Sequence, residues 1–455
     1  MNKETGTKTI GLDIGTTSVS AVVFNEDKQE VLLARTARSG LFLQAANEWE
    51  RLQDADELTS LAKNLLEELL SDFPDICGIG LTGQMHGILY TDEDGHAVSP
   101  LYTWQDRRGD VPLQDGRSMS ERVREMTGLT VPAGYGLLTH LTLQETGGET
   151  KNEPAGVRGT ALCTIGDYLG MVLTGRKRPI IHISNAASLG FYDVGKNGFR
   201  TDALKKMGMD LSLLPEVTDE YTVLGTFRGI PVTAAVGDNQ ASFLGSVGLK
   251  ENALLLNIGT GGQISMLADR PYSIEGIETR PMTKDRYLLA GASLCGGRAY
   301  AALERFFRSY AGSACGTEEP QYSVMEQIAE REWRKDPQQA FRLQVDTTFM
   351  GTREDPLRRG SIANLSEDTF TPEHLILGVM AGMARELHDM YRKIEAGTGL
   401  TAASMTGSGN GLRNNRILQE ICCHIFGKPM ALSGNREEAA CGAAAAAAEA
   451  LRQKK

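Results

Sequence analysis

Short apolar runs that end in glycine-containing turns recur along the chain. Residues 9–24 form two such runs around one turn, and their alternating pattern with β-branched side chains predicts a β-hairpin. Leucines at positions 58, 61, 65 and 69 have helical spacing, so an amphipathic helix is expected over residues 54–70. A strand over residues 75–81 should follow, and residues 117–175 have a mainly helical pattern.

The second half of the chain repeats this style. Strands are predicted over residues 253–258 and 287–290, and Gly296-Gly297 should open a helix that continues through Phe307. A long helix should follow Thr371, because Pro372 suits the first helical position and an acidic residue comes next. A glycine-rich turn over residues 405–411 leads to a helix from Asn414, and an alanine run at 443–448 is best explained by tight helix packing. The elements together predict an α/β fold.

Residues 234–265 combine two of these strand ends. A strand at 232–236 leads into Gly237-Asp238-Asn239-Gln240, and the strand at 253–258 leads into Gly259-Thr260-Gly261-Gly262. Strand ends are where an α/β sheet carries its chemistry. An acid in one turn and a Gly-Thr loop in the next suggest a hydroxyl group activated beside a bound phosphate.

The chain also contains an internal repeat. Residues 12–20 resemble residues 256–265, with an offset of 244 positions up to the turn and one extra residue after it. One strand–turn–strand device in each half predicts two related domains that face a shared cleft. The boundary is expected near residues 246–252, which gives domains over residues 1–248 and 249–455.

Composition narrows the possible functions. The 455 residues carry a formal net charge of −11 and no basic block, which argues against a nucleic-acid partner or an anionic membrane surface. Seven scattered cysteines without a Cys-x-x-Cys motif favour a reducing cytoplasm over disulfides or a zinc site. No stretch approaches the length of a membrane span, so a cytoplasmic location is expected.

The two Gly-Thr turns are candidate phosphate loops. The GxxxxGK[ST] motif is absent, and each turn joins two strands, so they are not P-loops. Backbone N–H groups with Thr and Ser hydroxyls can nevertheless hold phosphate oxygens, although a single turn of this kind is also typical of an ordinary hairpin. Asp13 lies beside the first turn, and a carboxylate near phosphate requires a cation. Asp13 is therefore a candidate Mg²⁺ ligand, with water in between.

Asp238 lies where a strand becomes a helix. An aspartate there commonly serves as an N-cap, whereas the functional alternative is a general base for a substrate hydroxyl. The helix N-terminus is expected to lower the pKa of this carboxyl group and keep it ionised. A weak base is sufficient for phosphoryl transfer, because the proton leaves late.

Two polar–aromatic clusters stand at other strand ends. Their members are Gln84, His86, Trp104, Gln105, Asp106 and Arg107. Amide and carboxylate groups bind hydroxyls, and an aromatic face covers the C–H surface of a sugar. A lone His86 would more often be a structural histidine. The two clusters together favour a pocket for a sugar or polyol.

These segments resemble the FGGY family of carbohydrate kinases over nearly the whole chain. The resemblance implies an α/β fold of two ribonuclease-H-like (actin-type ATPase) domains that flank a catalytic cleft, with ATP and Mg²⁺. It implies Asp238 as catalytic base and Asp13 and Asp238 at the metal. It assigns the sugar to Gln84, Met85, His86, Trp104, Asp106, Arg107, Asp238 and Asn239. It assigns the nucleotide to Gly15, Thr16, Thr17, Ser18, Gly259, Thr260, Gly261, Gly297, Gly407, Ser408, Gly409 and Asn414.

Three segments refine the implied substrate. The GQMHG segment at 83–87, the TWQD segment at 103–106 and the NAAS segment at 185–188, which is similar to a strand of the family, look most like kinases that act on sedoheptulose. The implied reaction is phosphorylation of a ketose at a primary hydroxyl, giving sedoheptulose 7-phosphate. Xylulose or another ketose or polyol is the nearest alternative substrate. An actin- or chaperone-like ATPase without a sugar is the more distant one, and a homodimer is expected from the resemblance.

Overall fold

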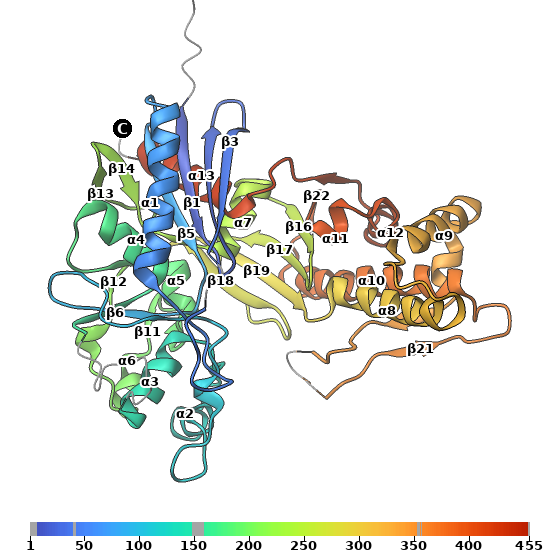
Figure 1. Ribbon diagram of the computed structural model, residues 1–455, viewed down its shortest axis with the longest axis horizontal. Coiled ribbons are helices and arrows are strands. Elements are labelled where there is room, and N and C mark those ends of the chain that lie inside the picture. The colour runs from blue at the N-terminus through green and yellow to red at the C-terminus, as the bar shows by residue number, and fades with distance from the viewer. Residues whose placement is uncertain (1–6, 40–41, 148–158, 353–354, 356, 454–455) are drawn as a thin grey trace, which may run out of the picture. The chain divides into compact units, whose positions relative to one another are not determined.

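The chain forms two compact units in the computed structural model, which describes residues 7–39, 42–147, 159–352, 355 and 357–453 (Figure 1). The first unit contains residues up to Gly248 together with Arg280–Arg286 and Gly434–Lys455. The second contains Leu249–Thr279 and Tyr287–Ser433. The C-terminal segment, which the sequence predicts as part of the C-terminal domain, therefore packs with the first unit.

A mixed seven-stranded sheet forms the centre of the first unit. The strand order is β13-β14-β5-β1-β2-β3, and β15 also pairs with β5. The predicted hairpin is confirmed, since β1 pairs with β2 in antiparallel register, and β1 runs parallel to β5. The strands are β1 Lys8–Ile14, β2 Ser18–Asn25, β3 Glu30–Arg38, β5 Gly78–Gly83, β13 Val223–Phe227, β14 Ile230–Thr233 and β15 Val236–Gly237.

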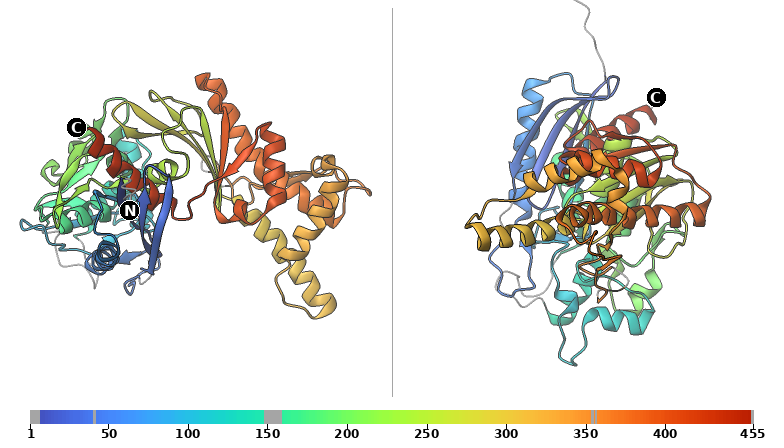
Figure 2. Two further views of the ribbon diagram at one scale, coloured as in Figure 1. Left: turned by 90° about the horizontal axis from the view of Figure 1, so that it is seen from above. Right: turned by 90° about the vertical axis from the view of Figure 1, so that its right-hand side faces the viewer.

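The C-terminal helix α13 (Glu438–Gln453) packs against β1, β2 and β5, where Figure 2 shows it in dark red beside the blue strands. The contact is close because glycines face it. A Cβ atom on Gly11 would lie 1.8 Å from the Ala440 carbonyl oxygen, and one on Gly80 equally near that of Ala443. Helix α7 (Asp238–Val247) packs on α13 through Gly442 in the same way. The alanine run therefore serves tight helix packing, as predicted.

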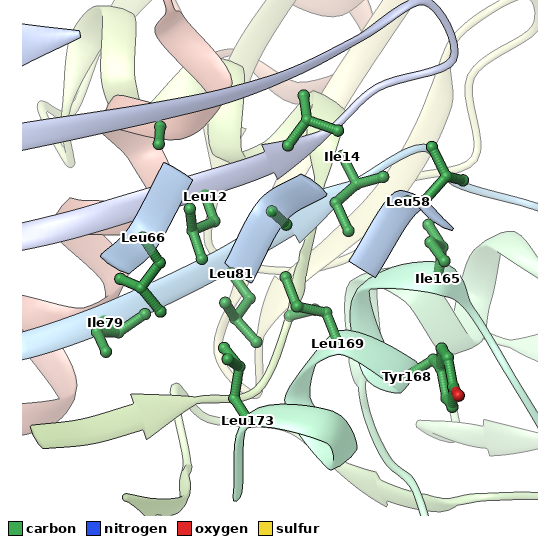
Figure 3. Close-up of a cluster of buried hydrophobic side chains, with 14 of the residues drawn as sticks. Leu12, Ile14, Leu58, Leu66, Ile79, Leu81, Ile165, Tyr168, Leu169 and Leu173 are labelled. Carbon is green, nitrogen blue, oxygen red and sulfur yellow. The ribbon is translucent and has the colours of Figure 1, made fainter. Parts of the chain in front are cut away.

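The opposite face of this sheet carries the main apolar core. Helices α1 (Ala55–Asp72) and α4 (Ile165–Thr174) supply its leucines, which pack on side chains of β1 and β5 (Figure 3). Leu12, Leu66 and Leu81 are completely buried there. Because side chains alternate across a strand, Leu12 and Ile14 point into this core while Gly11 and Asp13 face α13.

Smaller elements complete the first unit around a second apolar cluster. One expectation was wrong: the NAAS segment is not a strand but the short helix α5 (Ile183–Ser188), which His182 caps by accepting a hydrogen bond from the Ser184 backbone N–H. The remaining helices are α2 Met119–Thr127, α3 Gly136–Thr146 and α6 Thr201–Lys206, with 3₁₀ turns at Arg108–Asp110 and Leu211–Leu213. Short strands are β4 Leu52–Gln53, β6 Leu89–Thr91, β7 Leu101–Tyr102, β8 Ala161–Cys163, β9 Ile180–His182, β10 Tyr192–Asp193, β11 Gly198–Phe199 and β12 Glu216–Thr218.

A six-stranded sheet of order β18-β19-β17-β16-β22-β23 forms the centre of the second unit, although the segment Arg280–Arg286, which includes most of β18, groups with the first unit. Its strands are β16 Ala253–Ile258, β17 Gly262–Ala268, β18 Glu278–Thr283, β19 Arg286–Ser293, β22 Ser404–Ser408 and β23 Met430–Leu432. Its helices are α8 Gly296–Cys315, α9 Tyr322–Lys335, α10 Pro372–Thr398, α11 Asn410–Arg413 and α12 Arg416–Phe426. A 3₁₀ turn at Pro337–Phe341 precedes a small hairpin, β20 Gln344–Asp346 and β21 Ser361–Ala363.

The predicted start of α10 is confirmed. Pro372 stands in the first helical turn, where its missing N–H costs nothing, and the Thr371 side chain caps the helix by accepting from the His374 N–H.

The two sheets share one topology. In each, a hairpin (β1–β2, β16–β17) has a third strand parallel to its first member (β5, β22). Asp13 pairs with Thr82 in the first sheet, and Asn257 pairs with Ser408 in the second. The repeat seen in the sequence is therefore a repeat of structure, in which Asn257 replaces Asp13.

Among the described residues, no helix is both long enough and apolar enough to cross a membrane. All seven cysteines are free thiols.

Candidate active site

Asp238 is the first residue of α7 and follows directly on β15. Gly237 occupies the N-cap position, and no side chain caps the helix. A Cβ at Gly237 would lie 2.8 Å from the Met85 Sδ atom, so the Met85 side chain packs directly against this turn. The Asp238 carboxylate instead accepts a hydrogen bond from Asn239 Nδ2 at 3.0 Å. The carboxylate is therefore not used as the helix cap, and it remains available for chemistry.

The Asp238 carboxyl group has a pKa raised to about 6. Burial is the main cause, and it outweighs the hydrogen bonds from the Asn239 backbone and side chain and the positive charge of Arg280, which lower the pKa. The expectation of a pKa lowered by the helix N-terminus was wrong. Removal of the charged carboxylate from water destabilises it by more than the neighbouring groups stabilise it. A base with a pKa near neutrality is better matched to proton transfer.

Asp13 lies on the α13 side of β1. Its Oδ1 atom is buried and has no hydrogen-bond partner among the described residues. Burial raises its pKa to about 7, and the negative charges of Asp238 and Glu437 add to the effect. An unpartnered buried oxygen near a second carboxylate fits a cation. No group of three or more His, Cys, Asp or Glu side chains in the described parts of the chain could hold a metal, but Mg²⁺ commonly takes only one or two carboxylates and completes its shell with water and phosphate.

The first candidate phosphate loop is the turn between β1 and β2, Gly15-Thr16-Thr17 with Ser18 at its end. The Gly15 N–H donates to the Ser18 carbonyl at 2.9 Å, and the Ser39 hydroxyl donates to the Gly15 carbonyl at 3.2 Å. These bonds hold the loop in one conformation at the C-terminal end of β1, the strand that carries Asp13.

The GQMHG segment follows β5 and is held by α5. His86 has a positive φ of 73°, which is rare for a side chain with Cβ. The Ser188 hydroxyl accepts from the His86 backbone N–H at 3.1 Å, and His86 Nδ1 lies 2.7 Å from the Ser188 carbonyl. A carbonyl can only accept, so Nδ1 carries the proton, and in the neutral ring Nε2 is the acceptor. The ring also stacks on Tyr135, with centroids 4.3 Å apart.

The TWQD segment divides into different roles. Trp104 is 47% exposed, and its Nε1 donates to the Thr16 hydroxyl at 3.0 Å, which links a predicted sugar residue to the predicted phosphate loop. Asp106 is completely buried and pairs with Arg108 at 2.8 Å. It fixes the segment by accepting from the Arg51 backbone N–H and from Arg108, and its place at the sugar stays a prediction. Arg107 is exposed and pairs with Asp110 at 2.7 Å.

Helix α5 supports the turn before Asp238. The Ser184 hydroxyl accepts from the Gly237 N–H at 2.8 Å, and Asn185 Nδ2 donates to the Ala235 carbonyl at 2.9 Å. Behind Ser184 lies His182, whose pKa burial lowers to about 3, so the ring is neutral and accepts from Ser184. The NAAS motif thus acts by positioning Asp238 and His86.

The second unit contains a pocket of about 600 Å³ beside the second Gly-Thr loop. Gly259, Thr260, Gly297 and Asn414, all predicted nucleotide residues, line it together with an apolar wall of Tyr300, Met380, Met383 and Leu418. A polar end beside a glycine loop and an apolar wall fit a phosphate tail and a base, and the volume is ordinary for a small-ligand site.

Glycines set the geometry of this pocket. The Gly297 N–H, in the first turn of α8, donates to the Gly259 carbonyl at 3.1 Å, and a Cβ on Gly297 would lie 2.3 Å from that oxygen. Gly261 lies against Gly296 in the same way. Gly407 and Ser408 end β22, and Gly409 precedes α11 with a positive φ of 86°. These three residues support the pocket and are not among its lining residues.

A larger hollow, about 890 Å³, lies in the same unit between α10 and the β20–β21 hairpin. Its charged lining mixes Arg358, Arg385 and Lys393 with a greater number of carboxylates, and it contains none of the predicted nucleotide residues. Its chemistry points to no single ligand.

Several residues of the site carry no motif that reveals them in the sequence. Gln53 donates to the Thr16 carbonyl at 2.9 Å, and Tyr135 supports His86. Arg280 and Glu437 act on the carboxyl groups by charge, from segments far along the chain. Only tertiary packing brings these four residues to Thr16, His86 and the two carboxyl groups.

Two α/β units of one topology, one with a buried carboxyl group at a strand end and a Gly-Thr loop and the other with a pocket of small-ligand size, are consistent with the actin-type ATPase fold. The chain belongs to the FGGY family of carbohydrate kinases. The family's N-terminal domain matches residues 8–245 and its C-terminal domain matches residues 254–451. The chain is thus a kinase with an alcohol group as acceptor, and the alternative of an ATPase without a sugar substrate is set aside.

Individual relatives agree with this membership. The chain is 28% identical to the sedoheptulokinases of Mus musculus and Homo sapiens, in each case over 96% of both chains. The crystal structure of xylulose kinase from Rhodospirillum rubrum has the same fold, with a TM-score of 0.80 and 22% identity over 97% of this chain and 89% of that chain.

Proposed function

We propose that the protein transfers the γ-phosphoryl group of ATP to a primary hydroxyl of a ketose, with sedoheptulose as the substrate and sedoheptulose 7-phosphate as the product. The observation that carries the proposal is the Asp238 carboxyl group, placed at a strand end, with a pKa of about 6, next to the GQMHG segment. The sedoheptulokinases among the relatives support the choice of sugar. Xylulose is the second candidate, because structural neighbours include xylulose kinases.

In this proposal Asp238 accepts the proton of the attacking hydroxyl. Its partner Asn239 keeps one carboxylate oxygen oriented through the 3.0 Å hydrogen bond, which leaves the other oxygen for the substrate. Asp13 and Asp238 would hold Mg²⁺, which when bound neutralises charge on phosphate oxygens. The N–H groups of Gly15 and Gly259 already donate to the Ser18 and Gly261 carbonyls and close the two loops. Backbone N–H groups and hydroxyls of the remaining loop residues, Thr16–Ser18 and Thr260–Gly261, would bind the phosphates, while Gly297 and Asn414 contact the nucleoside.

The sugar would lie against Trp104 and His86. The exposed indole face can cover the C–H surface of a sugar, and the His86 imidazole is a polar group of the GQMHG segment that can hydrogen-bond a hydroxyl. Met85 packs beneath the turn at Gly237 and limits the depth of the site.

An ADP-release assay over sedoheptulose, xylulose, other ketoses, aldoses and polyols tests the proposal. Sedoheptulose should give the highest kcat/KM, and NMR of the product should place the phosphate on the primary hydroxyl of carbon 7. Higher kcat/KM on xylulose would assign the second candidate, and ADP release that no sugar stimulates would refute the kinase assignment.

The variant Asp238→Asn tests the base. Sugar phosphorylation should fall by roughly 10²–10⁴-fold, because the amide cannot accept the proton, while nucleotide affinity stays similar. Asp202→Asn is the matched control, since Asp202 is an exposed aspartate in the first turn of another helix, α6. Near-normal turnover in Asp238→Asn would exclude Asp238 as the base.

A further inference from the structure

Two side chains from separate segments contact Thr16, and a third reaches it through one of them. Trp104 Nε1 donates to the Thr16 hydroxyl at 3.0 Å, and Gln53 Nε2 donates to the Thr16 carbonyl at 2.9 Å. Gln84 Nε2 in turn donates to Gln53 Oε1 at 2.9 Å. Of the two proposed sugar segments, TWQD is thus hydrogen-bonded directly to the proposed phosphate loop, and GQMHG is linked to it through Gln53.

Both glutamine side chains are buried, so their hydrogen-bond partners are fixed. Gln53 is fully buried and Gln84 is 3% exposed. Gln53 uses its amide oxygen for Gln84 and its amide nitrogen for Thr16, so its orientation is fixed by both neighbours. Gln84 Oε1 is also buried, and it has no hydrogen-bond partner among the described residues. The chain of amides therefore ends in one unused acceptor, which suits a donor hydroxyl of a ligand.

In the hydrogen bond between Trp104 and Thr16, the indole N–H can only be the donor. Because the Thr16 hydroxyl accepts from the indole N–H, its own proton remains available for donation to an oxygen such as that of a phosphate. A sugar that packs on the exposed Trp104 ring would hold the indole and so hold this hydroxyl in place.

We propose that Thr16 couples sugar binding to the first phosphate loop, with Gln53 as the positioning residue that relays contact at Gln84 and with Trp104 as the second link. The inference rests on the proposed function, which assigns Gln84 and Trp104 to the sugar and Thr16 to phosphate. Sugar and nucleotide then bind cooperatively, and the γ-phosphoryl group is transferred to the sugar and not to water.

The test measures this coupling directly. The Kd of the sugar is determined by calorimetry on the full chain, without and with a saturating non-hydrolysable ATP analogue and Mg²⁺. In the wild type the analogue should tighten sugar binding by about 5-fold or more. In Gln53→Leu and in Trp104→Phe this factor should fall toward 1. Trp104→Phe keeps an aromatic face and changes an exposed residue, so it tests the link even if Gln53→Leu folds poorly.

Matched controls remove similar hydrogen bonds elsewhere. Gln144→Leu loses an amide bond to the Gly208 carbonyl, and Trp333→Phe loses an indole bond to Glu420, and both should retain the wild-type coupling factor. A purely structural role of Gln53 would lower the melting temperature without changing the factor.

Two other outcomes are decisive in different ways. If the wild type couples sugar to nucleotide and both Gln53→Leu and Trp104→Phe couple equally well, the relay through Thr16 is refuted while the kinase assignment stands. If the wild type binds and phosphorylates no sugar, the proposed function fails and the relay fails with it.

Discussion

At Asp238, two opposing effects decide the chemistry of one carboxyl group. The helix start and Asn239 stabilise the charged form, whereas burial destabilises it more strongly, and the pKa settles at about 6. A base must be unprotonated to work. The raised pKa therefore predicts that kcat/KM is lost as pH falls through about 6 and reaches a plateau above about 7.

The variant Asn239→Ala should displace this acid limb. The Asn239 side chain lowers the pKa of Asp238, so its removal should shift the midpoint upward, by roughly one pH unit. A kcat/KM profile from pH 5 to 9 for both proteins checks this shift, with Asn435→Ala as a control in which a hydrogen bond to the Gly245 carbonyl is lost away from the carboxylate. An unchanged or lower midpoint in Asn239→Ala would show that another group controls the limb.

Residues of the candidate site were predictable from sequence to different degrees. Asp13, Asp238 and the Gly-Thr turns stand out because a strand that ends in glycine and a polar side chain is a local pattern. Asp106 belongs to the same kind of motif, but its pairing with buried Arg108 depends on packing that the motif does not encode. Gln53 has no motif at all, and only the fold brings it to Thr16.

At the scale of elements, α13 depends on glycines that lie far apart in the sequence. A Cβ atom on Gly442 would lie 1.8 Å from the Ala241 carbonyl oxygen of α7, and one on Gly245 would lie 1.9 Å from that of Glu438. Gly→Ala inside a helix ordinarily stabilises it, since alanine has the higher helix propensity. Here the methyl group would collide with backbone, which cannot move aside as a flexible side chain can.

Gly442→Ala should therefore lower the melting temperature, by roughly 3–10 °C, against the direction of helix propensity. Gly434→Ala is the matched control, because no atom lies within 4 Å of its Cβ position and its φ is not positive. Differential scanning fluorimetry of both variants measures the effect. A melting temperature for Gly442→Ala at or above that of the wild type would mean that α7 and α13 are not packed so closely.

Long periodic elements followed from sequence, and short ones did not. The hairpin β1–β2, the strand β16 and the helix α10 all have patterns that tertiary structure leaves unchanged. The family resemblance predicts a strand at the NAAS segment, and the six residues of α5 are too few to show a helical period that would correct it. Its conformation is fixed by the cap at His182 and by two hydrogen bonds with the turn before Asp238. The Ser184 hydroxyl accepts from the Gly237 N–H, and Asn185 Nδ2 donates to the Ala235 carbonyl.

At the scale of the molecule, the sequence shows that a unit is duplicated, but it does not show which segments of the chain belong to each compact unit. The repeat of residues 12–20 at 256–265 indicated two units of one topology. The return of Gly434–Lys455 to the first unit was not foreseeable, because it depends on Gly11, Gly80 and Gly245 facing α13 in three dimensions. The division into residues 1–248 and 249–455 follows the chain, whereas the compact units follow this packing.

Two units with separate ligand residues predict separate footprints in hydrogen–deuterium exchange. ADP should slow amide exchange by about tenfold at the start of α8 and across α11 and the start of α12, since these segments line the 600 Å³ pocket. Sedoheptulose should slow exchange in residues 84–88 and in α5, which hold His86 and the turn before Asp238. The two footprints belong to different units because each ligand stabilises the residues that it contacts. Slowing by ADP alone that is confined to the first unit would contradict the assignment of the nucleotide to this pocket. Slowing by the sugar in α11 and α12 would contradict the assignment of the sugar to the first unit.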